Sequence, residues 1–180
     1  MPKPELAHEY VKRLFSYNPE TGNLRWNKRP RSDFKNLQAF NTWNTKFVNT
    51  VVGSVNGNGY QLVSIDNHTY RVPRIIWFWV VGYWPNIIDH INGQRTDNRW
   101  KNLRSVTRSE NQRNAKLHKH NISGICGIAY SKPCKKWRAR ITVNNITKHI
   151  GLFIKLEDAI AARKAAEKEH GFHPNHGRTT

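Results

Sequence analysis

Residues 87–114 constrain the fold of this chain more than any other stretch. Apolar residues lead into Asp89 and His90, and the turn-forming pair Asn92-Gly93 then opens a polar loop. A short strand pattern follows the loop, and a helix pattern comes after it. The segment therefore predicts a strand, a loop, a second strand and a helix in succession.

A capping box marks the start of this helix. The Thr107 hydroxyl can accept from the backbone N–H three residues on, while the Glu110 carboxylate reaches back to the N–H of Thr107. Asn111 therefore lies in the first turn or just past it. Asn is a mediocre helix former, so its presence there indicates either simple solvent exposure or a functional role.

The spacing of the polar residues favours the functional role. Successive strand side chains point to opposite faces, so Asp89 and His90 can serve one site only if the strand bends at the Asn92-Gly93 turn. The carboxylate of Asp89 and the amide oxygen of Asn111 are hard ligands that suit Mg²⁺. An imidazole beside such a metal, here His90, can deprotonate a water or act as a ligand.

The segment resembles the HNH endonucleases of the phage and intron homing type, which have a ββα-metal active site. The matching words follow in order and without gaps: Asp-His-Ile-Asn-Gly, Thr-Asp-Asn-Arg, Lys-Asn-Leu-Arg, Val-Thr and Glu-Asn-Gln-Arg-Asn. The resemblance implies metal ligation by Asp89 and Asn111, a general base in His90, and Asn102 holding the loop so that the imidazole is oriented. An Asn as the last motif residue favours Mg²⁺ or Mn²⁺. A retained fold without catalysis is the alternative.

Charge and cysteine content indicate the partner and the compartment. The formal net charge is +18 over 180 residues, which favours a polyanionic binding partner. Nucleic acid is the partner that we expect first, and an anionic membrane surface is the alternative. The longest apolar run, residues 75–81, is far shorter than the roughly 20 residues of a membrane span. We therefore expect a soluble, cytoplasmic protein. Cys126 and Cys134 are expected to be reduced and partly buried, although the sequence leaves a single disulfide open.

The region before residue 87 predicts mixed short elements. We expect a helix over residues 4–16, a strand over 24–26, an irregular loop over 28–49, strands over 51–55, 60–65 and 69–72, and a buried helix over 75–81. A DNA-facing role for Lys28, Arg29 and Arg31 is no better supported than solvation. This region also resembles the part that precedes the motif in phage HNH proteins, except that Pro73 stands where the family usually has His.

A second basic module follows. Over residues 137–144 apolar residues alternate with basic and polar ones, which predicts a strand with one apolar and one cationic face, and an alanine-rich helix is expected over 156–170. Residues 122–171 resemble the APETALA/ethylene-response-factor (ERF) type of DNA-binding domain through Gly124-Ile125-x-Gly127-Ile128, Lys136-Trp137-x-Ala139-x-Ile141 and Ile150-Gly151-x-Phe153. The resemblance implies a small three-stranded antiparallel sheet packed on one helix, and the Asn144-Asn145 pair predicts the turn between two of its strands. The predicted DNA-binding residues are Lys132, Lys135, Lys136, Arg138, Arg140, Thr142 and His149.

Together these patterns predict an α+β protein with two modules: an HNH nuclease domain over 1–114, a linker over 115–121, an ERF-like domain over 122–171 and a loose tail over 172–180. The expected function is cleavage of double-stranded DNA at a preferred site, with Mg²⁺ or Mn²⁺ but with no small-molecule cofactor and no membrane. A monomer is favoured, and the oligomeric state on DNA is open. A non-catalytic DNA-binding regulator is the main alternative, and an RNA-binding protein is a third class. The target site and the choice between nicking and double-strand cleavage are open.

Overall fold

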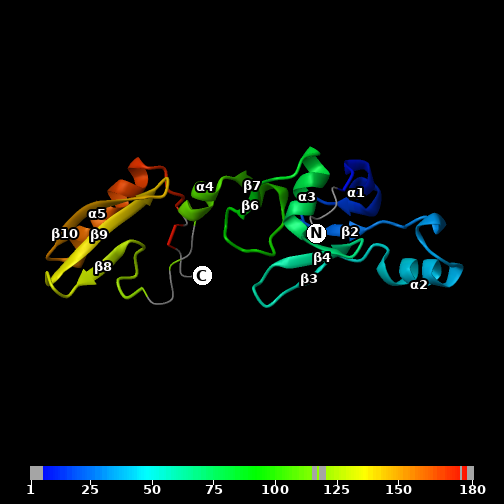
Figure 1. The fold of residues 1–180 in the computed structure, drawn as a ribbon, viewed down its shortest axis with the longest axis horizontal. Helices are drawn as coiled ribbons and strands as arrows, with labels where there is room; N and C mark the ends of the chain where they lie inside the picture. Colours follow the sequence, from blue (N-terminus) through cyan, green and yellow to red (C-terminus); the bar gives the residue numbers. More distant parts are fainter. Residues whose placement is uncertain (1–5, 115–116, 118–120, 175, 178–180) are drawn as a thin grey trace. The chain divides into compact units, whose positions relative to one another are not determined.

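The computed structural model describes residues 6–114, 117, 121–174 and 176–177. The chain divides into two compact units, Met1–Ser105 and Val106–Thr180. Helices and small antiparallel sheets make it an α+β protein, as the sequence predicts (Figure 1). Most of the predicted linker over 115–121, including His118 and His120, lies outside the described residues.

The first helix is shorter than expected. Helix α1 covers His8–Leu14, and the chain then turns into strand β1 (Phe15–Tyr17), which pairs with β2 (Leu24–Trp26). The predicted helix over residues 4–16 was wrong at its C-terminal end, because Phe15 is extended (φ −134°) and its backbone pairs with Trp26 while its ring is buried. Residues 4 and 5 lie outside the described part of the chain.

The expectation of an irregular loop over residues 28–49 was also wrong. A short 3-10 helix, η1 (Arg31–Asp33), is followed by helix α2 (Leu37–Phe47), whose N-cap residue Asn36 accepts from the N–H of Ala39 at 2.8 Å. Aromatic residues lie at helical spacing on α2, but no α2 residue is fully buried. The sequence analysis missed this helix although Phe40, Trp43 and Phe47 recur at helical spacing.

The three predicted strands and the buried helix are present, although the strand expected over 51–55 covers only Ser54–Val55. Strands β3 (Ser54–Val55), β4 (Gln61–Ile65) and β5 (His68–Arg71) form one antiparallel sheet, and both residues of the β4–β5 turn have positive φ. Helix α3 (Val72–Val81) begins three residues earlier than expected, because Pro73 occupies its first turn, where a missing N–H costs nothing. It ends at Gly82, which is left-handed (φ 80°).

The core of the first unit joins α1 to α3. Val11, Leu14, Ile75 and Ile76 are at most 1% exposed. Trp77 on α3 lies against Trp100, with ring centroids 5.0 Å apart, so the same core also supports the loop that follows β6. No described helix is both long and apolar enough to cross a membrane.

The strand, loop, strand and helix predicted for residues 87–114 are all observed. They are β6 (Ile87–His90), a loop ending in the 3-10 helix η2 (Trp100–Asn102), β7 (Leu103–Val106) and α4 (Arg108–Arg113). Strands β6 and β7 pair with each other. The capping box is present as expected, since Thr107 N donates to Glu110 Oε2 at 2.7 Å and Glu110 N donates to Thr107 Oγ1 at 3.3 Å.

The second unit contains the predicted three-stranded sheet and its helix. Strands β8 (Ile128–Ser131), β9 (Lys136–Val143) and β10 (Ile146–Phe153) lie in the order β10-β9-β8, and α5 (Leu156–Glu169) packs on one face (Figure 1). Asn144 and Asn145 turn the chain between β9 and β10 with positive φ. Ala159 is fully buried against the sheet, as its small size predicts.

An unexpected buried ion pair within α5 contacts the segment that follows the helix. Arg163 and Glu167 are 3% and 7% exposed, and Arg163 Nε lies 3.1 Å from Glu167 Oε1. The ring of Phe172 lies under the Arg163 guanidinium, and His176 Nε2 is 3.3 Å from Arg163 Nη2. These contacts attach a segment that we expected to be a loose tail; Asn175 and residues 178–180 lie outside the described part.

The two thiols differ in exposure. Neither Cys126 nor Cys134 is in a disulfide. Cys126 is half-buried, as expected, and burial raises the pKa of its thiol. Cys134 is exposed in the β8–β9 turn, so the expectation of a partly buried thiol was wrong there.

Candidate active site

Strand β6 presents Asp89 and His90 at its C-terminal end. Both residues are buried, at 8% and 6% exposure. The chain turns directly after them: Gly93 N donates to His90 O at 2.7 Å, and Gly93 has a φ of 74°. The bend that the sequence required is therefore present next to the two residues.

Asp89 forms an ion pair that the sequence analysis did not anticipate. Arg104, on the partner strand β7, donates from Nε and Nη2 to Asp89 Oδ2 at 3.0 and 2.7 Å. A carboxylate has about four acceptor positions, so it can accept from a guanidinium and bind a metal together. Asp89 therefore fits a hard divalent cation in its chemistry, with Arg104 fixing its orientation.

His90 is held inside the loop by Asn98. The imidazole Nε2 lies 3.2 Å from Asn98 Oδ1, and Asn98 is 2% exposed. Burial lowers the pKa of His90 below its ordinary value of 6.5, and this outweighs the opposing influence of Asn98 and Asp89. The neutral imidazole therefore predominates at pH 7, the form in which a histidine can accept a proton.

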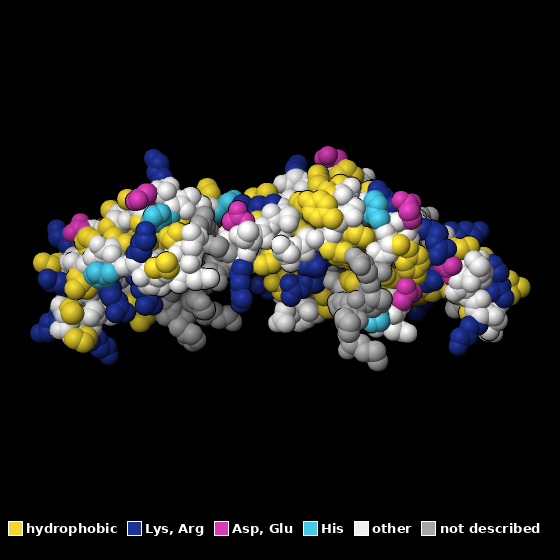
Figure 2. Space-filling view, turned by 45° about the horizontal axis from the view of Figure 1, so that its top comes forward, with side chains coloured by type: hydrophobic (Ala, Val, Ile, Leu, Met, Phe, Trp, Pro, Cys, Tyr) yellow, Lys and Arg dark blue, Asp and Glu magenta, His cyan; other side chains and the backbone are white. Residues whose placement is uncertain are grey.

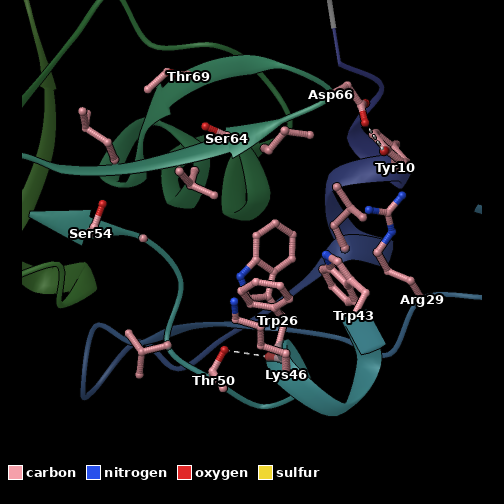
Figure 3. Close-up of a pocket in the computed structure, with 17 residues that line it drawn as sticks. Tyr10, Trp26, Arg29, Trp43, Lys46, Thr50, Ser54, Ser64, Asp66 and Thr69 are labelled. Carbon is pink, nitrogen blue, oxygen red and sulfur yellow. Dashed lines mark hydrogen bonds between the residues drawn. The ribbon is translucent and has the colours of Figure 1, made fainter. Parts of the chain in front are cut away.

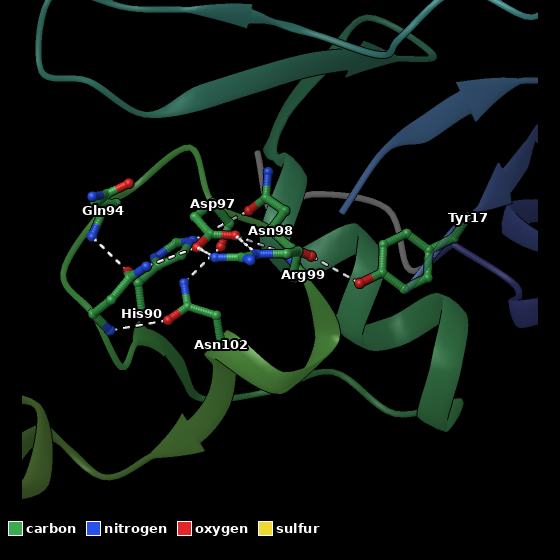
Figure 4. A network of polar contacts seen from close by, with 8 residues as sticks. Tyr17, His90, Gln94, Asp97, Asn98, Arg99 and Asn102 are labelled. Atoms are coloured by element: carbon green, nitrogen blue, oxygen red, sulfur yellow. Dashed lines mark hydrogen bonds and ion pairs between the residues drawn. The ribbon is translucent and has the colours of Figure 1, made fainter. Parts of the chain in front are cut away.

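Asn102 spans the two ends of the loop. Its Oδ1 accepts from Asn92 N at 2.9 Å, and its Nδ2 donates to Asp97 O at 2.7 Å. Asp97 in turn accepts from Arg99 at 2.6 and 2.7 Å, and this pairing lowers the pKa of Asp97 to about 2. Figure 4 shows these side chains converging inside the loop, so the loop is closed by its own polar residues.

The N-terminal region also supports the loop, which the sequence analysis missed. Tyr17 on β1 donates from its hydroxyl to Asn98 O at 2.8 Å (Figure 4), and Trp100 N donates to Pro19 O at 3.0 Å. Burial raises the pKa of Tyr17 to about 12, so the hydroxyl stays protonated. Gly22 lies so close to the backbone of Asn98 and Arg99 that no side chain fits there. The Tyr-Asn-Pro-Glu-Thr-Gly segment, residues 17–22, therefore packs against the loop of the HNH motif.

Asn111 lies on α4 and is half-buried, and its N–H donates to Thr107 O at 3.0 Å. It belongs to the second unit, whereas Asp89 and His90 belong to the first. Its role as a metal ligand therefore stays a prediction. Among the described residues, no group of three or more His, Cys, Asp or Glu side chains is placed to hold a metal ion.

The predicted DNA-binding residues lie on the surface of the second unit. Arg138, Arg140 and Thr142 are exposed on β9, with His149 opposite Arg140 and Thr147 opposite Thr142 in the register of β10. Lys132 and Lys135 are exposed in the β8–β9 turn, and Lys136 is exposed at the start of β9. Lys and Arg side chains project over this unit (Figure 2).

A cavity of the first unit lies away from these residues. Its volume is about 670 Å³, and its lining includes the aromatic and basic residues Trp26, Trp43 and Lys46 (Figure 3). Arg29, which borders it, donates to Asp33 at 3.0 Å and lies over the Trp43 ring. None of the predicted catalytic or metal-binding residues lines this cavity.

Comparison with known proteins agrees with the geometry of the loop. Residues 70–113 match a family described as HNH endonuclease. This segment is an HNH endonuclease domain. Over 78 residues, 41% of this chain, the sequence is 36% identical to Protein 3.8 of Escherichia phage T7. Over 113 residues, 57% of this chain, it is 31% identical to an uncharacterized HNH endonuclease of Acanthamoeba polyphaga mimivirus.

These similarities are partial. The chain spans 64% of the phage protein and 28% of the mimivirus protein. No solved structure matches the chain significantly. The HNH domain includes Asp89, His90, Asn102 and Asn111, whereas the β8–β10 sheet lies outside residues 70–113.

Proposed function

We propose that this protein is a metal-dependent endonuclease of the homing type, which hydrolyses phosphodiester bonds in double-stranded DNA at a preferred site. The observation that carries the proposal is the buried His90 beside Asp89, within a loop of the HNH domain that Asn98 and Asn102 close by hydrogen bonds. Such a loop fixes a general base without adding mobile groups to the site.

In this proposal the chain's own residues divide the work. His90 accepts the proton of a water that attacks the phosphorus, and the products carry 3′-hydroxyl and 5′-phosphate ends. Asn102 keeps the loop closed around the imidazole. Asp89 and Asn111, the ligands that the resemblance implies, would hold Mg²⁺ or Mn²⁺, and the ion would supply positive charge where negative charge develops on the phosphate.

The β8–β10 sheet is proposed to hold the duplex. Its exposed face carries Arg138, Arg140, Thr142 and His149, with Lys132, Lys135 and Lys136 beside it, while the apolar face packs on α5. Basic side chains on a sheet can take phosphates and reach base edges in the major groove. The exposed basic residues of the sheet support DNA binding independently of the HNH domain. The formal net charge of +18 agrees with a polyanionic partner.

The proposal is tested by incubating the protein with supercoiled plasmid that carries its natural site, with Mg²⁺ and with EDTA. We expect nicked or linear DNA only with the metal. His90→Ala should lower the cleavage rate about 10²- to 10⁴-fold with unchanged DNA binding. His68→Ala, a histidine of the same unit outside the loop, is the matched control. An equal loss of binding and cleavage in His90→Ala would make His90 a structural residue.

One observation favours a second candidate, a non-catalytic DNA-binding regulator that keeps the HNH fold. The Arg104 guanidinium lies against Asp89, and a cation there competes electrostatically with a divalent metal. The same assay separates the two functions. Site-preferring binding without cleavage in either Mg²⁺ or Mn²⁺ would support the regulator.

A further inference from the structure

Two arginines of the first unit lie over one aromatic ring. The guanidinium carbon of Arg71 is 4.2 Å from the centroid of the Tyr60 ring, and that of Arg95 is 4.3 Å from the same centroid. Because both distances end at one point, the two carbons are at most 8.5 Å apart. Both arginines are exposed, whereas Tyr60 is half-buried. The ring therefore holds two positive charges together at the surface, and we call these three residues the arginine cluster.

No acidic side chain neutralises the arginine cluster within the part of the chain that the structure describes. Arg95 donates from Nη1 to Asn58 O at 2.5 Å, but this carbonyl carries no net charge. The ion pairs of the described residues all use other basic partners, which are Arg13, Arg29, Arg99, Arg104, Arg163, Lys164 and His176. Both charges of the cluster are thus available to an anion from outside the chain.

The stability of the fold does not explain this placement of charge. Arg71 is the N-cap residue of α3, and the first turn of that helix contains no acid. A helix N-terminus carries a partial positive charge and favours acidic residues, so it repels Arg71. Arg95 repels Arg71 as well, because their separation does not exceed the screening length of roughly 8–10 Å at moderate salt by any wide margin. A bound anion would relieve both repulsions.

Two hydrogen bonds fix the arginine cluster beside the loop of the HNH motif. Arg95 follows His90 in that loop, and its bond to Asn58 O joins the loop to the β3–β4 hairpin. Asn98, in the same loop, donates to Gln61 on β4 at 2.8 Å. The hairpin and the loop are therefore held together, so an anion bound by the cluster would lie next to the segment that carries the candidate base.

We propose that Arg71 and Arg95 together bind one phosphate of the DNA backbone, with the Tyr60 ring holding both guanidiniums in place. A guanidinium is a planar fork of N–H donors that suits phosphate oxygens, and one phosphate has enough acceptor oxygens for two forks. Such a contact fixes the register of a strand without reading its bases. The assignment of this phosphate to a DNA substrate rests on the proposed nuclease function, whereas the affinity of the cluster for a phosphate does not.

The first experiment measures the salt dependence of DNA binding. The full chain is titrated against a fluorescein-labelled duplex in EDTA, and binding is followed by fluorescence anisotropy. Replacing both arginines, Arg71→Met with Arg95→Met, should reduce the slope of log K against log salt by about 0.9, the contribution of one phosphate. An unchanged slope overturns the proposal. A reduction of about 1.8 would show two separate phosphates and overturns the shared site.

Arg13→Met is the matched control. Arg13 also lies over a tyrosine ring, with its guanidinium carbon 5.2 Å from the centroid of Tyr10, but it is paired with Asp33 at 3.0 Å. Its replacement should leave the slope at the wild-type value. An equal reduction in this variant would reflect a general loss of positive charge and overturns the proposal.

A lysine variant separates phosphate binding from a structural role. Arg71→Lys with Arg95→Lys keeps both charges but lacks the planar forks, so Kd should rise at least several-fold while the slope stays at the wild-type value. Denaturant unfolding shows that each variant is folded. If the folded lysine variant lost the same slope as the methionine variant, the two arginines would be structural residues and the proposal would fail.

A phosphate scan then locates the contact. In duplexes that carry the natural site, single phosphates are replaced one at a time by neutral methylphosphonates. One replacement should weaken binding by the wild type but leave binding by the methionine variant unchanged, because its protein partner is already absent there. The absence of any such position overturns the proposal. A wild-type protein that shows this position but cuts no DNA refutes the nuclease function and leaves the phosphate site standing, so the two failures are distinguishable.

Discussion

Gly22→Ala should separate the support of the loop from the chemistry of His90. Gly22 has a φ of +75°, and a Cβ built on it would lie 2.5 Å from both Asn98 C and Arg99 N. Real Cβ atoms essentially never approach closer than 3.0 Å, and the atoms in the way belong to the backbone, so no side-chain rotation relieves the overlap. The loop or the 18–23 turn must therefore move.

Two costs add in this variant. A left-handed φ costs a non-glycine residue about 1–2 kcal/mol, and forcing an extra carbon into a packed site costs typically about 1–3 kcal/mol. Gly22→Ala should thus lower the free energy of unfolding by about 2–5 kcal/mol. Because Asn98 carries the hydrogen bond to His90, cleavage should fall as well, even where the protein remains folded.

Two glycines of the same unit serve as matched controls. Gly59 has nearly the same φ, +77°, but its Cβ would meet only Arg95 Cδ at 4.0 Å, so Gly59→Ala isolates the backbone cost of about 1–2 kcal/mol. Gly57 has no neighbour within 4 Å of a Cβ, and its substitution by Ala should be close to neutral. The difference in the free energy of unfolding between Gly22→Ala and Gly59→Ala therefore measures the cost of the steric overlap with the backbone of Asn98 and Arg99.

Denaturant unfolding measures these differences as shifts of the midpoint at constant m-value. Cleavage of plasmid by each variant at a temperature well below its midpoint gives the functional readout. If Gly22→Ala and Gly59→Ala unfolded at the same midpoint and cut equally well, the packing of the Tyr-Asn-Pro-Glu-Thr-Gly segment against the loop would be refuted.

Three further outcomes are expected. Arg140→Ala should reduce the slope of log K against log salt by about 0.9 if Arg140 meets a phosphate, measured by fluorescence anisotropy; an equal change in Lys168→Ala, on the α5 helix, would contradict this. The pKa of Asp97 is lowered to about 2 in the folded protein, so its ionised carboxylate should stabilise the fold above pH 4 by about 1–2 kcal/mol. This contribution should be lost as the pH falls from 4 to 2, and Asp97→Asn should lack it at every pH. Mg²⁺ or Mn²⁺ should restore cleavage after EDTA treatment and Zn²⁺ should not; stoichiometric zinc found by elemental analysis would contradict the hard-ligand assignment.

Local physics let the sequence determine the strand, loop, strand and helix of residues 87–114. The Thr107–Glu110 capping box and the Asn144-Asn145 turn depend only on neighbouring residues, and both are observed. The alternation along β9 likewise predicts which face is buried, because side chains of a strand alternate. The sequence also placed Asp89 and His90 at the end of a strand that bends directly after them.

Contacts between distant residues were decided only by the tertiary structure. Gln61 and Asn98 are 37 positions apart and Tyr17 and Asn98 are 81 apart, and no local pattern relates such positions. Helix α2 was missed although Phe40, Trp43 and Phe47 recur at helical spacing, because its other residues are mostly polar and none of its residues is fully buried. The ion pair of Asp89 with Arg104 depends on the register of β6 with β7, which hydrophobic patterning specifies only weakly in two short strands. Periodicity reports the burial of a side chain, whereas the choice of its polar partner depends on how the elements pack.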